Sequence, residues 1–202
     1  MYDSKLRGLK DTLMAPLADA LGQRVSPNAL SVAAFALGMA CAAAAYAGLV
    51  LPSLALWLLN RIVDGLDGLV ARRSGRTSDR GAYLDIVLDF VVYAALPLSL
   101  ALGDAGRAPS AAALLAAFYV NGATWMYLSS LLEKRGRGAA ASGQATGVAM
   151  PAGIIEGAET IAFFSLILAL PAYAAPLMYA FALLTILGAA LRFVQGFRAL
   201  HA

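Results

Sequence analysis

The sequence predicts an all-α polytopic membrane protein, with six transmembrane helices preceded by a short N-terminal interfacial helix. Of its 202 residues, 61% are hydrophobic and only 13% are charged, which is too apolar for a soluble domain of this size. Six apolar runs are long enough to cross a hydrocarbon core of about 30 Å as helices, and runs this continuous do not fit barrel strands. They are Asn28–Ala47, Leu51–Val70, Ala82–Leu102, Ser110–Leu132, Ala149–Leu170 and Ala172–Phe193.

The distribution of Lys and Arg predicts the orientation, because cytoplasmic flanks carry the excess of these residues. One side collects most of them, and the other side has only Arg107. We therefore expect both termini and the longer connections to be cytoplasmic, in a bacterial inner membrane. The residues on the basic side are Lys5, Arg7, Lys10, Arg24, Arg72, Arg73, Arg76, Arg80, Lys134, Arg135, Arg137 and Arg198.

Residues 1–25 are predicted to be a separate N-terminal helix at the cytoplasmic face, and residues 26–202 the membrane domain. Leu6, Leu9 and Leu13 alternate with charged residues at a spacing that suits a helix lying in the interface. An ordinary charged tail is the alternative. The membrane domain starts at Ser26, which is a cap-type residue, followed by Pro27 at the first helical position.

Four aspartates lie in or beside strongly apolar sequence on both sides of the second connection. Asp64 and Asp67 are three residues apart near the end of one predicted span, and Asp85 and Asp89 are four apart near the start of the next. Each pair shares one face of its helix. Two antiparallel neighbouring helices can therefore bring all four carboxylates together at matched depth, about 6–12 Å from the connection.

Four unpaired carboxylates at such a site would repel one another, and divalent cations remove the conflict. The ligands are hard oxygens with no His or Cys among them, which indicates Mg²⁺ or Mn²⁺ and a pair of ions. The one cysteine, Cys41, lies in an apolar run, and the one histidine, His201, is next to the C-terminus. A single acid near a helix end is more often merely ion-paired, but four at this spacing indicate a functional site.

The motif formed by these residues resembles the signature of the CDP-alcohol phosphotransferases. It reads Asp64-x-x-Asp67-Gly68-x-x-Ala71-Arg72, then eight residues, then Gly81-x-x-x-Asp85-x-x-x-Asp89. The resemblance implies that Asp64, Asp67, Asp85 and Asp89 bind the metal pair and that Asp89 is also the general base. It further implies that Gly68, Ala71, Arg72 and Gly81 bind the CDP moiety.

The resemblance also implies the reaction and the partners. Such an enzyme transfers a phosphatidyl group from CDP-diacylglycerol to a small alcohol, releases CMP in phospholipid biosynthesis and works as a homodimer among membrane lipids. Nothing in the sequence predicts a nucleic-acid partner. The acceptor stays open, as do transfer from a CDP-amino-alcohol to diacylglycerol and two other classes, a Mg²⁺ transporter and a catalytically inactive scaffold.

Several charged residues outside the motif have two readings each. Glu156 and Glu159 either line the cavity or pair with Arg61 or Arg192. Arg61, three residues before Asp64, is expected to neutralise it. Three cations after the fourth span either bind a phosphate on the acceptor or only set the topology, and the second is favoured; they are Lys134, Arg135 and Arg137.

Overall fold

The computed structural model describes residues 2–22, 24–138, 141 and 153–201, and within these the protein is helical with no strands. The α-helices are α1 (Tyr2–Gly22), α2 (Pro27–Tyr46), α3 (Val50–Arg73), α4 (Asp79–Gly103), α5 (Ala108–Lys134), α6 (Gly157–Ala169) and α7 (Ala174–His201). Two short 3-10 turns, η1 (Ala105–Arg107) and η2 (Pro171–Tyr173), precede α5 and α7. The predicted all-α class is confirmed.

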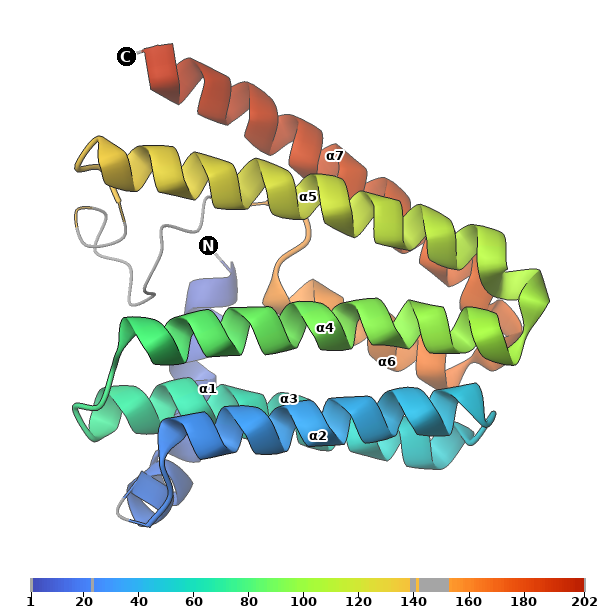
Figure 1. Cartoon of the computed structure of the whole chain (residues 1–202), viewed down its shortest axis with the longest axis horizontal. Coiled ribbons are helices and arrows are strands. Elements are labelled where there is room, and N and C mark those ends of the chain that lie inside the picture. Colours follow the sequence, from blue (N-terminus) through green and yellow to red (C-terminus); the bar gives the residue numbers. More distant parts are fainter. Residues whose placement is uncertain (1, 23, 139–140, 142–152, 202) are drawn as a thin grey trace.

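The long helices run along one common direction, and α1 crosses them at one end (Figure 1). That end also holds the α3–α4 connection, the end of α5 and the end of α7, and the opposite end holds the tight α2–α3 and α4–α5 turns (Figure 1). The basic residues of the α3–α4 connection therefore share one end of the bundle with α1, as the sequence predicts.

In the part of the chain that the structure describes, four helices are long and apolar enough to cross a membrane, namely α2, α4, α5 with η1, and η2 with α7. Helix α3 has 24 residues but includes Arg61, Asp64 and Asp67 within its apolar stretch. The predicted span 149–170 needs correction: residues 149–152 lie outside the described residues, 153–156 are not helical, and α6 has only 13 residues. The start of this helix could not be predicted from hydropathy, because the non-helical residues before Gly157 are also mostly apolar.

Local signals set the helix starts around the site. Pro27 opens α2, where the Ser26 hydroxyl accepts a hydrogen bond from the Ala29 N–H at 3.2 Å. Ser78 caps α4 in the same way, accepting from the Gly81 N–H at 3.1 Å. Because both caps lie at the end of the bundle near α1, they place the first turns of α2 and α4 beside the last turns of α3 (Figure 1).

Two apolar clusters hold the bundle together. The larger is centred on Trp57, Phe164 and Phe181, all fully buried, and joins α2 to α7. The smaller packs α1 through Ala18 against Leu69 and other residues of α3. The smaller cluster lies next to the motif, so α1 is a fixed neighbour of the site.

Candidate active site

Three of the four motif aspartates converge between α3 and α4. One carboxylate oxygen each of Asp64, Asp67 and Asp85 lies within 4.8 Å of the other two. The i, i+3 spacing on α3 presents the first two to α4, and the antiparallel α3–α4 hairpin supplies the third at the same depth. We call these residues the three-aspartate cluster. Within the described residues it is the only group of this kind.

Asp67 is the most buried of the motif aspartates, with 4% of its surface exposed. Its Oδ2 accepts a hydrogen bond of 2.5 Å from the hydroxyl of Ser31, which lies on α2 and is itself buried. A third helix therefore orients one carboxylate of the cluster. Ser31 was missed by the sequence analysis, because a lone serine in an apolar helix gives no signal of its partner.

Asp89 lies beside the three-aspartate cluster and has a different partner. Asp64, Asp85 and Asp89 line one small cavity between α2, α3 and α4. The Oδ1 of Asp89 accepts a hydrogen bond of 2.8 Å from Nη2 of Arg61, whose Nη1 lies 3.5 Å from Asp64 Oδ2. Arg61 was expected to neutralise Asp64, and its shorter contact is in fact with Asp89.

The remaining motif residues lie on the side of the site nearest α1. A Cβ on Gly68 would meet Nη1 of Arg72 at 3.2 Å, so this glycine leaves room for that guanidinium. Nη2 of Arg72 lies 3.1 Å from Asp11 Oδ2 on α1. Gly81 provides close contact between α4 and α2, because a Cβ there would lie 3.1 Å from Asn28 Oδ1. Ala71, one residue before Arg72, is half-buried.

The two glutamates cap a helix. Glu156 is the N-cap of α6, and its carboxylate accepts from the Gly153 N–H at 3.1 Å while Glu159 accepts from the Glu156 N–H at 3.0 Å. The Glu156 carboxylate also accepts from the backbone N–H of Glu159, and this reciprocal pair of bonds between Glu156 and Glu159 satisfies free N–H groups at the start of the helix. It provides a structural reason for both acids that the sequence analysis did not consider, because α6 begins later than predicted.

The cations after α5 contact the end of α7. Arg135 Nη1 donates to the Leu200 carbonyl at 2.7 Å, and Arg137 Nη1 donates to the Ala199 carbonyl at 3.0 Å. Cations near a helix C-terminus stabilise its free carbonyl groups. These contacts link α5 to α7, a structural role for Arg135 and Arg137 that neither reading of the sequence included.

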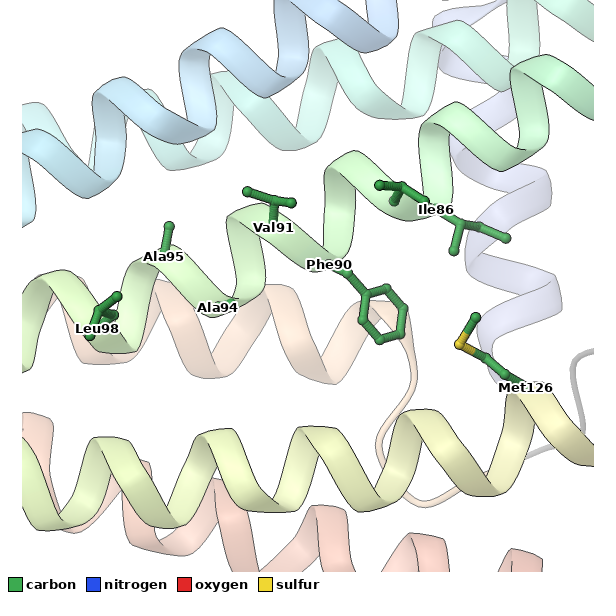
Figure 2. Close-up of a pocket in the computed structure, with 8 residues that line it drawn as sticks. Ile86, Phe90, Val91, Ala94, Ala95, Leu98 and Met126 are labelled. Carbon is green, nitrogen blue, oxygen red and sulfur yellow. The ribbon is translucent and has the colours of Figure 1, made fainter.

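An apolar groove lies elsewhere on α4, on its side towards α5 (Figure 2). Phe90 and Met126 approach each other across the space between α4 and α5 (Figure 2). The lining contains no titratable group, so it offers no chemistry; the residues are Ile86, Val87, Phe90, Val91, Ala94, Ala95, Leu98 and Met126. The groups that can take part in a reaction are therefore the motif aspartates and not the residues of this groove.

The donor set of the three-aspartate cluster consists of carboxylate oxygens at close range. Such oxygens suit a hard divalent cation, and a partly buried group of three carboxylates without a cation would be strongly unfavourable. The neighbouring Asp89 adds a fourth carboxylate that can accept a proton from a bound hydroxyl. A helical membrane protein with such a site has the groups that a membrane enzyme acting at phosphate groups needs.

Comparison with known proteins identifies the family. The model of the CDP-alcohol phosphatidyltransferase family matches residues 24–194, and the chain belongs to that family. It is thus a membrane transferase of phospholipid metabolism.

Relatives of known sequence cover different shares of the chain. The chain is 34% identical to the inner membrane protein YnjF of Escherichia coli K12 over 150 residues, which are 74% of this chain and 72% of that protein. This similarity supports an integral protein of the bacterial inner membrane. The bifunctional IPC transferase and DIPP synthase of Aquifex aeolicus is 40% identical over 96 residues, which are 48% of this chain and only 22% of that protein.

Solved structures show the same fold. The Mycobacterium tuberculosis phosphatidylinositol phosphate synthase PgsA1 with CDP-DAG bound matches with a TM-score of 0.72 at 18% identity, over 92% of this chain and 94% of that one. The same protein in complex with manganese and citrate gives a TM-score of 0.71 at 19% identity, over 90% of this chain and 88% of that one. At this identity the likeness concerns the fold alone.

Proposed function

We propose that this protein transfers a phosphatidyl group from CDP-diacylglycerol to the hydroxyl of a small polar alcohol and releases CMP, using Mg²⁺ or Mn²⁺. The single observation that carries the proposal is the three-aspartate cluster beside Asp89, within the family's motif. The PgsA1 structures of the same fold, one with CDP-DAG bound and one in complex with manganese and citrate, support the donor and the type of metal.

Each aspartate has a role in this proposal. Asp64, Asp67 and Asp85 hold the cations, with Asp89 close enough to share them. Bound divalent cations neutralise the diphosphate of the donor and the charge that develops on the leaving CMP. Asp89 accepts the proton of the acceptor hydroxyl. At the same time the hydroxyl oxygen forms a bond to the β-phosphorus of the donor, and the bond from that phosphorus to the oxygen of CMP breaks. CMP leaves with the electron pair of the broken bond.

The motif residues near α1 hold the CDP moiety. Gly68 keeps space over the last turns of α3, and Arg72 places its guanidinium in that space. Arg72 can give up its contact with Asp11 for a phosphate oxygen, because a guanidinium binds two phosphate oxygens as readily as a carboxylate. Gly81 on α4 and Ala71 on α3 have no side chain or only a methyl group. They therefore leave room for the nucleotide to reach the three-aspartate cluster.

The orientation and assembly belong to the same proposal. The aspartates lie near the basic end of the bundle, so we infer that the site opens to the cytoplasm, from which a soluble acceptor and the CDP head group enter. The acyl chains of the donor then leave sideways into lipid. We also propose a homodimer, to be tested by the mass of the particle in detergent.

The experiment offers the purified protein CDP-diacylglycerol, Mg²⁺ or Mn²⁺ and a panel of acceptors, and follows CMP. Serine, glycerol phosphate and inositol phosphate form the panel, with a CDP-amino-alcohol and diacylglycerol as a separate pair. We expect Asp89→Asn to abolish turnover in a folded protein, while the matched Asp104→Asn at the opposite end of the bundle keeps full activity. Near-normal turnover by Asp89→Asn removes Asp89 from the role of base. If the protein instead carries ions into vesicles and releases no CMP, the proposed enzyme function is wrong and the transporter hypothesis is supported.

A further inference from the structure

The guanidinium of Arg61 is enclosed in the centre of the bundle, with 7% of its side chain exposed. Besides its contact with Asp89, it donates from Nη1 to the Tyr93 hydroxyl at 2.8 Å and from Nε to Asn60 Oδ1 at 2.6 Å. An arginine at this depth of a membrane protein is costly unless its charge and its donors are satisfied. Here three of its nitrogens donate to three different side chains.

Aromatic rings fix the plane of this guanidinium. Its central carbon lies 4.8 Å from the centre of the Trp57 ring and 5.2 Å from that of Tyr93. Trp57 is fully buried, and its indole N–H points to Ser165 Oγ of α6 at 3.2 Å. The orientation of Arg61 therefore depends on α4 and α6 as well as on its own helix.

Asn60 connects the same group to α2. Its Nδ2 donates to the Ala34 carbonyl at 2.6 Å, which leaves Oδ1 pointing at Arg61 Nε. Asn60 is 1% exposed, so this amide has little freedom to turn. Four helices thus hold one guanidinium in a single orientation.

We propose that Arg61 is a positioning residue for Asp89 in the transfer reaction. Its Nη2 binds Oδ1 of Asp89 and so holds this carboxylate at the wall of the cavity that Asp64 and Asp85 also line, where the acceptor hydroxyl would bind. Neither the motif nor the family resemblance includes Arg61. This inference rests on the proposed function, because it assigns a role only if Asp89 is the base.

The geometry distinguishes positioning from simple charge neutralisation. A neutralising cation gains most by lying against the three-aspartate cluster, whereas within the described residues Arg61 has its short contact with Asp89 and only a 3.5 Å contact with Asp64. The rigid fork of an arginine also binds Asn60, Tyr93 and Asp89 at once, which a lysine ammonium cannot do in the same orientation.

The test compares Arg61→Gln, Arg61→Lys and Tyr93→Phe with the matched Arg107→Gln at the opposite end of the bundle. Each variant is purified in detergent, checked for folding by its melting temperature, and assayed for CMP release at saturating Mn²⁺. Mn²⁺ binding is measured separately by electron paramagnetic resonance, which needs no turnover. The acceptor is the one that gives the fastest rate with the wild type.

We expect a fall in kcat with little change in binding. General bases contribute about 10²–10⁴-fold, so a misplaced base in Arg61→Gln should lower kcat by about 100-fold. Arg61→Lys should recover part of the rate, Tyr93→Phe should lose about fivefold, and KM for the donor should change by less than about threefold in each. Mn²⁺ affinity should be unchanged or higher, because the variant loses a positive charge near the cluster.

Three results overturn the proposal. The first is a kcat of Arg61→Gln within about threefold of the wild type. The second is a loss of Mn²⁺ binding in folded Arg61→Gln, with the rate restored by more Mn²⁺, which makes Arg61 a support of the metal site instead. The third result applies if Arg61→Gln does not fold: both Arg61→Lys and Tyr93→Phe then have the kcat of the wild type. A wild type that releases no CMP from any pair refutes the proposed function itself.

Discussion

Gly38 lets α4 approach α2 closely beside the site, and adding a methyl group there tests the packing. A Cβ at position 38 would lie 2.5 and 2.8 Å from the two γ-carbons of Val92 and 3.1 Å from Nδ2 of Asn60. Val92 is 1% exposed and cannot move aside, since buried side chains are packed as densely as in crystals. Overpacking costs about 1–3 kcal/mol, and contacts as short as 2.5 Å place this substitution at about 2–3 kcal/mol. The better helix propensity of alanine returns at most about 1 kcal/mol.

We therefore expect Gly38→Ala to lose about 1–2 kcal/mol net, which lowers the melting temperature by about 2–8 °C in a chain of this size. The assay is thermal unfolding of the purified protein in detergent, followed by tryptophan fluorescence. Gly157→Ala is the control, because a Cβ at the first residue of α6 meets nothing within 4 Å and should leave the melting temperature unchanged or higher. A Gly38→Ala variant that melts within about 1 °C of the wild type refutes the close approach of α2 to α4.

Three further perturbations follow from the described contacts. Chelation by EDTA should abolish CMP release and added Mg²⁺ or Mn²⁺ should restore it; activity that survives exhaustive chelation contradicts a metal enzyme. Ser31→Ala removes the hydroxyl that orients Asp67 and should weaken Mn²⁺ binding by about 10-fold, as for other partners of metal ligands. The control Ser99→Ala, which removes a hydroxyl bonded only within α4, should bind Mn²⁺ normally. A hydrogen bond from the Arg73 guanidinium lowers the pKa of Asp19 below its ordinary value of 3.8, so this link between α1 and α3 contributes stability above that pH and loses it as the pH falls through the lowered pKa. Limited proteolysis should cut α1 faster at pH 3 than at pH 6, and the ratio of the two rates should be larger in the wild type than in Asp19→Asn, which keeps the contact of Asp11 with Arg72 but not that of Asp19 with Arg73.

The aspartates could be predicted from the sequence because their arrangement depends on helical periodicity alone. Spacings of three and four residues on each side of a short connection determine which faces meet, whatever the rest of the bundle does. The sequence predicted that all four aspartates would meet, whereas the structure brings three of them into the cluster and places Asp89 beside it on a shared cavity. The helix boundaries near the site were also predicted closely, because Ser26 and Pro27 give a specific start signal.

The partners of Asp89 could not be predicted in the same way. Arg61 is three residues before Asp64, so the sequence spacing favours an ion pair between these two. The packing of α4 against α3 instead gives Arg61 its shorter contact with Asp89. Trp57 and Asn60 appear in the sequence as ordinary residues of an apolar run. Their contacts with α6 and α2 require knowledge of how the helices pack, which hydropathy does not contain.

The order of the helices has a consequence for how such a protein can diversify. The aspartates, Ser31 and Arg61 all come from α2, α3 and α4, which form one uninterrupted stretch from Pro27 to Gly103. Helix α5 packs chiefly on α7, after the sharp turn at Asp104. The ion-binding machinery is thus a contiguous cassette that recombination can inherit whole. Exchanging everything beyond Asp104 between relatives would remodel the other half of the molecule and keep the aspartates, provided that the new α6 retains the contact of Ser165 with Trp57 behind Arg61.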